Sequence, residues 1–243
     1  MSGDAMFSVH DLCAWYGAAQ ILYDLSFEVK RGEVVALMGR NGAGKSTTMK
    51  SIMGLVAHKR GAVRFGDRDL SRLKPYEIAR LGLGFVPEDR RIFSDLTVLE
   101  NLDVGRQAPH VFADGHEAPV WTPERLFALF PNLGRMPDRL GGHMSGGEQQ
   151  MLTVARTLMG NPLLVLLDEP SEGVAPVIVE QMANTILELK KEGLSIVLSE
   201  QNVHFAELVS DRVYVLEKGQ IRWNGSMADL IRNTEVQRSF LTV

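Results

Sequence analysis

Residues 39–47 read GRNGAGKST, and the first eight of them fit the pattern G-x-x-x-x-G-K-[ST]. The continuous apolar run from Val34 to Met38 precedes this stretch and predicts a strand buried on both faces. The apolar periodicity of residues 48–56 follows it and predicts a helix. Glycines between a strand and a helix let backbone N–H groups turn toward an anion, and the helix N-terminus adds partial positive charge. The stretch therefore predicts a phosphate-binding loop.

The side chains of this loop have distinct expected roles. Lys45 is expected to reach the β- and γ-phosphates of a nucleotide, and the Ser46 hydroxyl is expected to ligate Mg²⁺. The residues predicted to contact nucleotide here are Gly39, Asn41, Gly42, Ala43, Gly44, Lys45, Ser46 and Thr47.

A second apolar run, residues 163–167, ends in two carboxylates, Asp168 and Glu169. The strand that it predicts places Asp168 beside the phosphate loop. One carboxylate for Mg²⁺ and a second that polarises a water are what nucleotide hydrolysis needs. Strands often end in surface acids, so the pair gains its weight from the phosphate loop. Glu169 is the candidate base that orients the attacking water.

Residues 144–150 read MSGGEQQ and begin another predicted helix. Ser145 makes a good N-cap, and Glu148 completes a capping box. Capping alone describes a surface helix and leaves Gly146 and Gly147 unexplained, because glycine lowers helix propensity. The two glycines favour close approach to a ligand or to another backbone. We therefore expect these four residues to form a second anion site.

Most of the chain alternates short apolar runs with helical patterns, which predicts an α/β fold with a mostly parallel sheet. Residues 96–160 carry little strand pattern and predict a helical subdomain inserted into the α/β core. Within them, the Pro-, Gly- and His-rich residues 109–123 predict a surface loop. The remaining expected elements are strands at 25–29, 63–65, 83–86 and 196–198, a hairpin of 213–216 with 220–223, and helices at 98–104, 125–130 and 176–193.

The composition limits the class of protein. The 243 residues carry 26 Lys and Arg against 30 Asp and Glu, and this net charge of −4 argues against nucleic acid as a partner. No apolar run is long enough to span a bilayer, and the N-terminus lacks the apolar segment of a signal peptide. Cys13 is the only cysteine, which excludes disulfide scaffolds and fits a reducing compartment.

Together these segments resemble the ATP-binding-cassette (ABC) ATPases over nearly the whole chain. Residues 39–47 resemble the Walker A motif, residues 144–150 the signature motif and residues 163–170, LLVLLDEP, the Walker B motif. The resemblance implies ATP and Mg²⁺ as cofactors. It also implies that the signature motif of one subunit closes over ATP held by the phosphate loop of another. Tyr16 matches the aromatic residue that stacks on adenine in this family.

The resemblance further implies one ABC ATPase domain over residues 1–243, with a P-loop NTPase core of α/β type and an antiparallel β subdomain. The nucleotide-binding core would comprise residues 1–95 and 161–243. The helical subdomain that carries the signature motif would comprise residues 96–160.

Three positions depart from the usual family pattern. Glu88 stands where Gln is usual, Ala175 where Asp is usual and Gln201 where His is usual. Glu88 can still accept a hydrogen bond from a water on Mg²⁺, so the expected metal site comprises Ser46, Glu88 and Asp168. Gln201 can hydrogen-bond to a γ-phosphate oxygen but cannot carry a positive charge, so we expect slower hydrolysis than with His. The alternative is that a partner ATPase supplies most of the hydrolysis.

These departures resemble one branch, the ATPases of branched-chain amino acid importers, and residues 86–102, 144–152, 168–176 and 199–202 carry this resemblance. It implies two integral membrane permease subunits, a second ABC ATPase in a heterodimer or homodimer, and an extracytoplasmic solute-binding protein that acts indirectly. The chain would lie on the cytoplasmic face of the inner (plasma) membrane as a peripheral subunit. ATPases of urea or short-chain amide importers, of lipopolysaccharide-type exporters and of non-transport systems remain alternatives, as does a regulatory subunit with little turnover.

Overall fold

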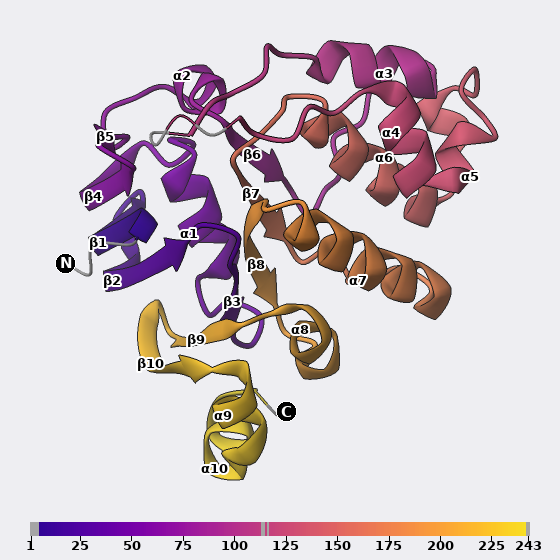
Figure 1. Ribbon diagram of the computed structural model, residues 1–243. Coiled ribbons are helices and arrows are strands. Elements are labelled where there is room, and N and C mark those ends of the chain that lie inside the picture. The colour runs from indigo at the N-terminus through magenta and orange to yellow at the C-terminus, as the bar shows by residue number, and fades with distance from the viewer. Residues whose placement is uncertain (1–4, 113–114, 116, 242–243) are drawn as a thin grey trace.

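The structure is a computed structural model that describes residues 5–112, 115 and 117–241 (Figure 1). Its centre is a six-stranded sheet of order β10-β9-β3-β8-β7-β6, in which β9, β3, β8, β7 and β6 are parallel and β10 is antiparallel. The mostly parallel sheet expected from the sequence is therefore confirmed. The strands are β3 (Val34–Met38), β6 (Leu83–Val86), β7 (Leu164–Asp168), β8 (Ser195–Glu200), β9 (Arg212–Glu217) and β10 (Gln220–Ser226).

A second, antiparallel sheet has the order β2-β1-β4-β5 and lies beside the large sheet (Figure 1). The sequence predicted only parts of β2 and β4 by periodicity, although the resemblance implied an antiparallel β subdomain. Its strands are β1 (Ala5–Tyr16), β2 (Ala19–Lys30), β4 (His58–Phe65) and β5 (Arg68–Asp69).

Helices cover both faces of the large sheet. One face carries Val35, Leu37 and Leu166 and packs against α1 and the small sheet. The other face carries Leu167 and Leu198 and packs against α6 and α7. Because both faces are covered, β3 and β7 are buried along their whole length, as their continuous apolar sequences predicted. The helices named so far are α1 (Lys45–Ile52), α6 (Gly146–Leu158) and α7 (Pro176–Lys191).

Helical turns fill the chain between β6 and β7, where the sequence predicted a helical insertion (Figure 1). They gather at the end of the molecule away from the small sheet and pack around α6. The elements are α3 (Val98–Gly105), α4 (Pro123–Leu129), α5 (Pro131–Gly134) and a 3₁₀ turn at Gly141–His143. The other helical elements are α2 (Pro75–Arg80) before β6, α8 (Val203–Val209) after β8, and α9 (Met227–Arg232), α10 (Thr234–Val236) and a π-helical turn (Gln237–Leu241) at the C-terminus.

Residues 109–123 were predicted to form a surface loop, but the segment is partly buried and its end is helical. Its described residues carry an isolated bridge between Val111 and Glu117 and then enter α4. Three of its apolar side chains are buried: Phe112 and Ala118 pack into the core beside the small sheet, and Trp121 packs into the core around α6. Residues 113, 114 and 116 of this segment lie outside the described residues.

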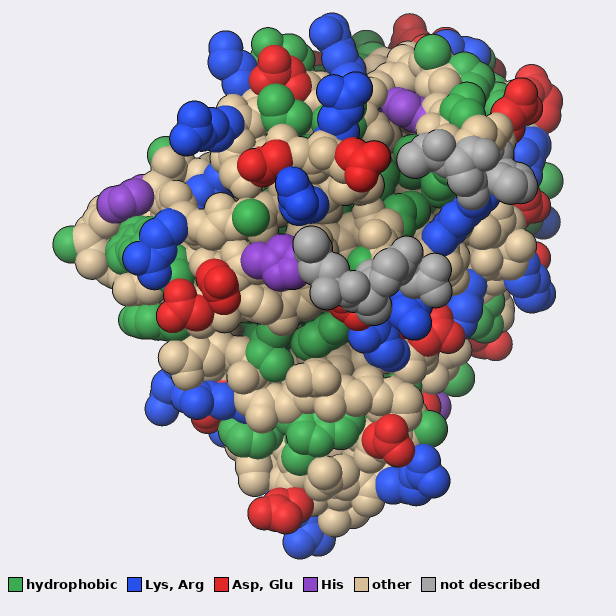
Figure 2. Space-filling model, turned by 60° about the vertical axis from the view of Figure 1, so that its left-hand side comes forward, with side chains coloured by type: hydrophobic (Ala, Val, Ile, Leu, Met, Phe, Trp, Pro, Cys, Tyr) green, Lys and Arg blue, Asp and Glu red, His purple; other side chains and the backbone are tan. Residues whose placement is uncertain are grey.

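No helix in the described part of the chain has both the length and the apolar character needed to cross a membrane. On the face in Figure 2, basic and acidic side chains are interspersed. Cys13 is buried, and its thiol donates to Asp24 Oδ1 at 3.1 Å. The buried thiol thus links β1 to β2 through Asp24.

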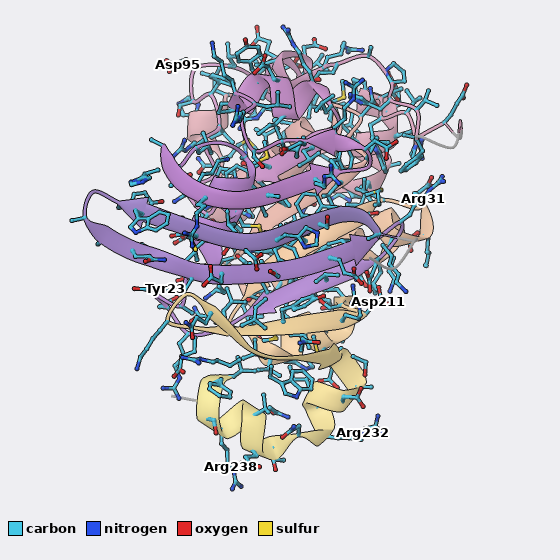
Figure 3. All side chains as sticks on the ribbon, turned by 90° about the vertical axis from the view of Figure 1, so that its left-hand side faces the viewer. Tyr23, Arg31, Asp95, Asp211, Arg232 and Arg238 are labelled. Atoms are coloured by element: carbon cyan, nitrogen blue, oxygen red, sulfur yellow. The ribbon has the colours of Figure 1, made fainter. Side chains whose placement is uncertain are left out.

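Gly219, in the turn between β9 and β10, joins the two sheets. Its N–H donates to Ala43 O at 2.8 Å, and its carbonyl accepts from Tyr23 N at 2.9 Å. Figure 3 shows Tyr23 where β2 lies against the β9–β10 hairpin. Gly219 has φ +76°, and a Cβ at this position would overlap the carbonyl oxygen of Ile21. Only glycine fits this junction between the phosphate loop and the small sheet.

Gly219→Ala is expected to lower the free energy of unfolding by about 2–5 kcal/mol, because left-handed strain and overpacking against backbone add together. Thermal unfolding of the purified variant measures this loss. Gly66→Ala is the matched control, since Gly66 also has positive φ but nothing lies within 4 Å of its Cβ position. A Gly219→Ala variant as stable as Gly66→Ala would show that the junction tolerates a side chain.

Candidate active site

The order of the large sheet brings the two predicted halves of the site together. β8 lies between β3 and β7, and all three are parallel, so the phosphate loop after β3 and the carboxylates at the end of β7 meet at one edge. A cavity of about 420 Å³ opens there. Of the predicted residues it is lined by Asn41, Gly42, Gly44, Lys45, Ser46, Thr47, Glu88 and Glu169. Ile21 and Glu172 also line it, and the sequence reasoning missed both.

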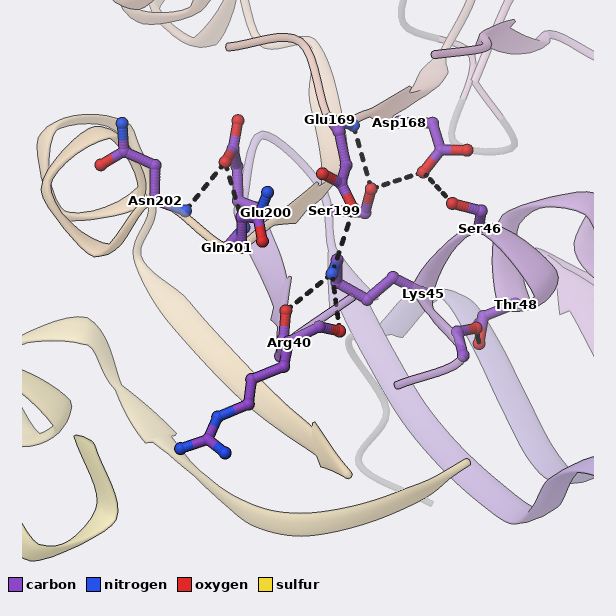
Figure 4. Close-up of polar contacts among 12 residues, drawn as sticks. Arg40, Lys45, Ser46, Thr48, Asp168, Glu169, Ser199, Glu200, Gln201 and Asn202 are labelled. Atoms are coloured by element: carbon purple, nitrogen blue, oxygen red, sulfur yellow. Dashed lines mark hydrogen bonds and ion pairs between the residues drawn. The ribbon is translucent and has the colours of Figure 1, made fainter. Parts of the chain in front are cut away.

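Lys45 is the central cation of this cavity. Its side chain is only 3% exposed, and its ammonium donates to Gly39 O at 2.6 Å and to Arg40 O at 3.2 Å (Figure 4). It also forms an ion pair of 3.1 Å with Glu169 Oε1. All three donors of the ammonium therefore have a protein partner. Binding of a phosphate anion at Lys45 must replace the ion pair with Glu169.

Asp168 forms the second polar centre of the site. Its Oδ1 accepts from the Ser46 hydroxyl at 3.0 Å and from the Ser199 hydroxyl at 2.6 Å (Figure 4). Its Oδ2 is buried and has no hydrogen-bond partner among the described residues. Burial raises the pKa of the Asp168 carboxyl above its ordinary value, although the two hydroxyls oppose the shift. An oxygen-ligated divalent cation would satisfy Oδ2 and favour the ionised form.

The donor set therefore fits Mg²⁺, as one carboxylate with a neighbouring hydroxyl. Among the described residues there is no group of three or more His, Cys, Asp or Glu side chains that could hold a metal ion. The remaining ligands of an octahedral cation would then come from waters and substrate phosphates, which is how Mg²⁺ is usually bound in nucleotide sites. Glu88 is exposed after the end of β6 and lines the same cavity.

Glu169 is held in an unusual conformation. Its φ is +48°, in the left-handed region that residues with a Cβ seldom adopt. Its N–H is fixed by the carbonyl and the hydroxyl of Ser199, at 3.1 and 3.0 Å. Its Oε2 is buried and has no hydrogen-bond partner among the described residues. Burial and the neighbouring Glu172 carboxyl raise the pKa of the Glu169 carboxyl, and Lys45 opposes them. Strain at a buried carboxylate is typical of functional sites.

The predicted capping box at residue 145 is confirmed. Ser145 Oγ accepts from Glu148 N at 3.4 Å, and Glu148 Oε2 accepts from Ser145 N at 2.7 Å. The two glycines lie against side chains of this same chain, because a Cβ on Gly146 would come within 2.8 Å of Arg90 Nη1 and one on Gly147 within 2.7 Å of Ile178 Cγ1.

Packing within the chain thus accounts for part of what the sequence ascribed to a ligand or another backbone. Neither the glycines nor their capping residues line the cavity of the phosphate loop. The second anion site stays a prediction, and within one chain it lies apart from the first.

Two further predicted residues do not line this cavity. Tyr16 ends β1 and is 50% exposed. Gln201 follows β8, and its N–H donates to Glu200 Oε2 at 3.1 Å. Their roles toward adenine and γ-phosphate stay predictions.

Ser199 and Glu200 are residues of the site that the sequence reasoning missed. They end β8, and polar residues at the carboxyl end of a buried parallel strand were a usable signal.

Comparison with known proteins identifies the family of this chain. The family model described as ABC transporter matches residues 22–172. The chain is 42% identical to the high-affinity branched-chain amino acid transport ATP-binding protein BraG of Pseudomonas aeruginosa, over 97% of this chain and 99% of that protein. It is 34% identical to the probable branched-chain amino acid transport ATP-binding protein LivF of Archaeoglobus fulgidus, over 93% and 94%. It is 32% identical to the lipopolysaccharide export system ATP-binding protein LptB of Escherichia coli, over 98% and 97%.

Solved structures agree with the sequence relatives. A nucleotide-free ATP-binding cassette from an ABC transporter matches with a TM-score of 0.78 at 29% identity, over 94% of each chain. The ADP conformation of an ATP-binding cassette of an ABC transporter matches with a TM-score of 0.77 at 28% identity, also over 94% of each chain. With its phosphate loop, its carboxylate pair and a family match over more than half its length, the chain belongs to the ABC transporter family as an ATP-binding cassette.

Proposed function

We propose that this chain is the ATP-binding and ATP-hydrolysing subunit of an importer for branched-chain, hydrophobic amino acids. The observation that carries the proposal is the identity of 42% with BraG along nearly the whole of both chains. Glu88, Ala175 and Gln201 support the same branch of the family. The identity with the lipopolysaccharide export protein LptB is lower, at 32%.

Lys45 and Glu169 carry the chemistry in this proposal. ATP binds with its phosphates on the loop of residues 39–47, and Lys45 exchanges its ion pair with Glu169 for the β- and γ-phosphates. Glu169 is thereby released to accept a hydrogen bond from the attacking water. Ser46 and Asp168 would hold Mg²⁺, with Glu88 reaching it through a water, and the cation would neutralise charge on the phosphates.

We infer that two ATPase subunits enclose the nucleotide. The capped N-terminus of α6, with residues 145–148, lies outside the cavity of its own phosphate loop and is available to a partner's ATP. The partner is a second, different ATPase or a second copy of this chain. Tyr16, half exposed at the end of β1, is free to stack on adenine.

We infer that the two permease subunits contact a groove beside the helical subdomain. A cavity of about 280 Å³ lies between β6 and the helices α3 and α6. Its wall includes Phe93 and Val104, which are 47% and 55% exposed, and the guanidinium of Arg156. In this proposal, Phe93 and Val104 would bury their exposed apolar surface against the permeases. Residues 96–160 would transmit closure to the permeases, and residues 1–95 with 161–243 would bind nucleotide.

This arrangement places the chain as a peripheral subunit on the cytoplasmic face of the inner (plasma) membrane. A solute-binding protein on the other side would select the amino acid and act on this chain only through the permeases.

Uptake measurements in the native host test the proposed solute. A strain lacking this chain is expected to lose uptake of radiolabelled leucine, isoleucine and valine at low concentration, and the wild-type chain is expected to restore it. A Lys45→Ala chain is expected to fail to restore it. Uptake of urea and of acetamide is the control and should stay unchanged. Loss of urea or amide uptake with intact leucine uptake would contradict the proposed solute class.

Gln201→His is expected to raise the ATPase rate of the purified ATPase pair about tenfold, equivalent to a barrier lower by about 1.4 kcal/mol. An imidazolium can place positive charge at the γ-phosphate, which a carboxamide cannot. Steady-state phosphate release measures the rate, and Gln201→Ala is the control that removes the side-chain hydrogen bond. An unchanged or lower rate in the His variant would count against a role for Gln201 at the γ-phosphate.

A further inference from the structure

Glu200, which ends β8, is a buried carboxylate to which the proposed function gives no role. Its side chain is 1% exposed, and it is one of three buried acids in the described residues, with Asp168 and Glu169. Burial raises the pKa of its carboxyl above the ordinary value. No salt bridge of the described residues includes Glu200, so no cation compensates the cost of burying it.

The Glu200 carboxylate accepts backbone hydrogen bonds from two separate loops. Its Oε1 accepts from Ser171 N at 3.2 Å, in the loop that follows Glu169. Its Oε2 accepts from Gln201 N and from Asn202 N, each at 3.1 Å (Figure 4). The two oxygens of one side chain therefore fix the spacing between these two loops.

The backbone of the same residue reaches the phosphate loop. The carbonyl of Glu200 accepts from Gly39 N at 3.3 Å, and Glu200 is the register partner of Met38 on β3. Residue 200 is thus the point where the phosphate loop, the loop after Glu169 and the loop with Gln201 are joined. The backbone contact is independent of the side chain, so a substitution at residue 200 tests the two outer loops separately from the phosphate loop.

The turn that Glu200 restrains is the one that holds Glu169. Ser171 lies two residues after Glu169, and Glu172 N donates to Glu169 O at 3.1 Å. Glu169 has a left-handed backbone conformation, which costs free energy. Such a conformation persists only where the surrounding contacts hold it. Ser199 fixes the near side of this turn through Glu169 N, and Glu200 fixes the far side through Ser171 N.

We propose that Glu200 is a positioning residue that holds Glu169 and Gln201 in register at the γ-phosphate, by joining the loops that carry them. The inference rests on the proposed ATP hydrolysis. Every backbone group that contacts the carboxylate is a donor, so only a group with acceptors on both atoms satisfies both loops. A glutamine can face its oxygen to Gln201 and Asn202, but its amide then faces the N–H of Ser171, donor against donor.

The test compares Glu200→Gln and Glu200→Ala with wild type in the purified ATPase assembly. We expect kcat to fall about tenfold in the Gln variant and about 100-fold in the Ala variant, since misplacement of reacting groups by about 1 Å has effects of this size. The KM for ATP and the dissociation constant of ATP are expected to stay within twofold of wild type, because Lys45 and the phosphate loop are unaltered. Glu207→Gln, an exposed acid on α8, is the control and should match wild type.

A purely structural role predicts a different pattern. It would lower the melting temperature, and the loss of kcat would vanish once rates are corrected for the folded fraction. That pattern, or an alanine variant with kcat within twofold of wild type, would overturn the inference, as would a parallel rise of KM. A wild-type assembly without ATPase activity would overturn the proposed function and this inference together. Active wild type with unaffected Glu200 variants would overturn this inference alone.

Discussion

Glu169→Gln is expected to lower kcat for ATP hydrolysis by at least about 100-fold, the lower end of what a positioned general base contributes. The substitution keeps the shape of the side chain and removes the charge that we propose orients the attacking water. ATP binding is expected to be retained or tightened, because Lys45 no longer has an ion pair of 3.1 Å with residue 169 that ATP must replace. Single-turnover hydrolysis and equilibrium ATP binding measure the two effects separately.

The matched control for this prediction is Glu172→Gln. Glu172 lines the same cavity as Glu169 but is exposed. Its kcat is expected to stay within about tenfold of wild type, since a group that only tunes a neighbouring acid contributes less than the base itself. Wild-type turnover in Glu169→Gln would show that the base is a different group.

Lys45→Ala is expected to weaken ATP binding by at least about 100-fold, or about 2.7 kcal/mol. In the proposed complex the ammonium contacts the β- and γ-phosphates, and alanine would leave their charge to backbone N–H groups and Mg²⁺. The nucleotide-free variant is also expected to be less stable by about 1–3 kcal/mol, since Glu169 Oε1 loses its partner while buried.

Titration with a fluorescent ATP analogue and thermal unfolding measure the two effects of Lys45→Ala. Lys50→Ala, on the same helix α1, is the control and should bind ATP like wild type. An affinity for ATP in Lys45→Ala that equals that of Lys50→Ala would contradict the assigned role.

The sequence predicted the parts of the fold whose signals are local. The apolar run of β3, the apolar run of β7 and the capping box of α6 each span only a few consecutive residues, so a short stretch of sequence predicts each of them. β1 was missed because register shifts interrupt its pairing with both neighbours, so apolar side chains do not alternate along it. The short helices from α8 onward were missed because one or two turns leave no measurable periodicity.

The sequence predicted which residues form the candidate site, but it did not predict the contacts between them. Phosphate-loop and carboxylate residues were named from motifs, and the structure places most of them around one cavity. The Lys45–Glu169 ion pair depends on β8 lying between β3 and β7, which no motif encodes. Ser199 and Glu200 acquire their contacts from the same strand order. The packing of Gly147 against Ile178 likewise joins residues that only the folded chain brings together.

Recovery of the working assembly is the decisive test of whether this chain serves a membrane transporter. The chain with Glu169→Gln would be tagged in its native host, extracted from membranes in mild detergent with Mg²⁺ and ATP, and its co-purifying proteins identified by mass spectrometry. Two membrane permease subunits and a second ATPase subunit are expected among these proteins. Ribosomal or DNA-bound partners, or the absence of any membrane protein, would contradict the assignment of this chain to a transporter.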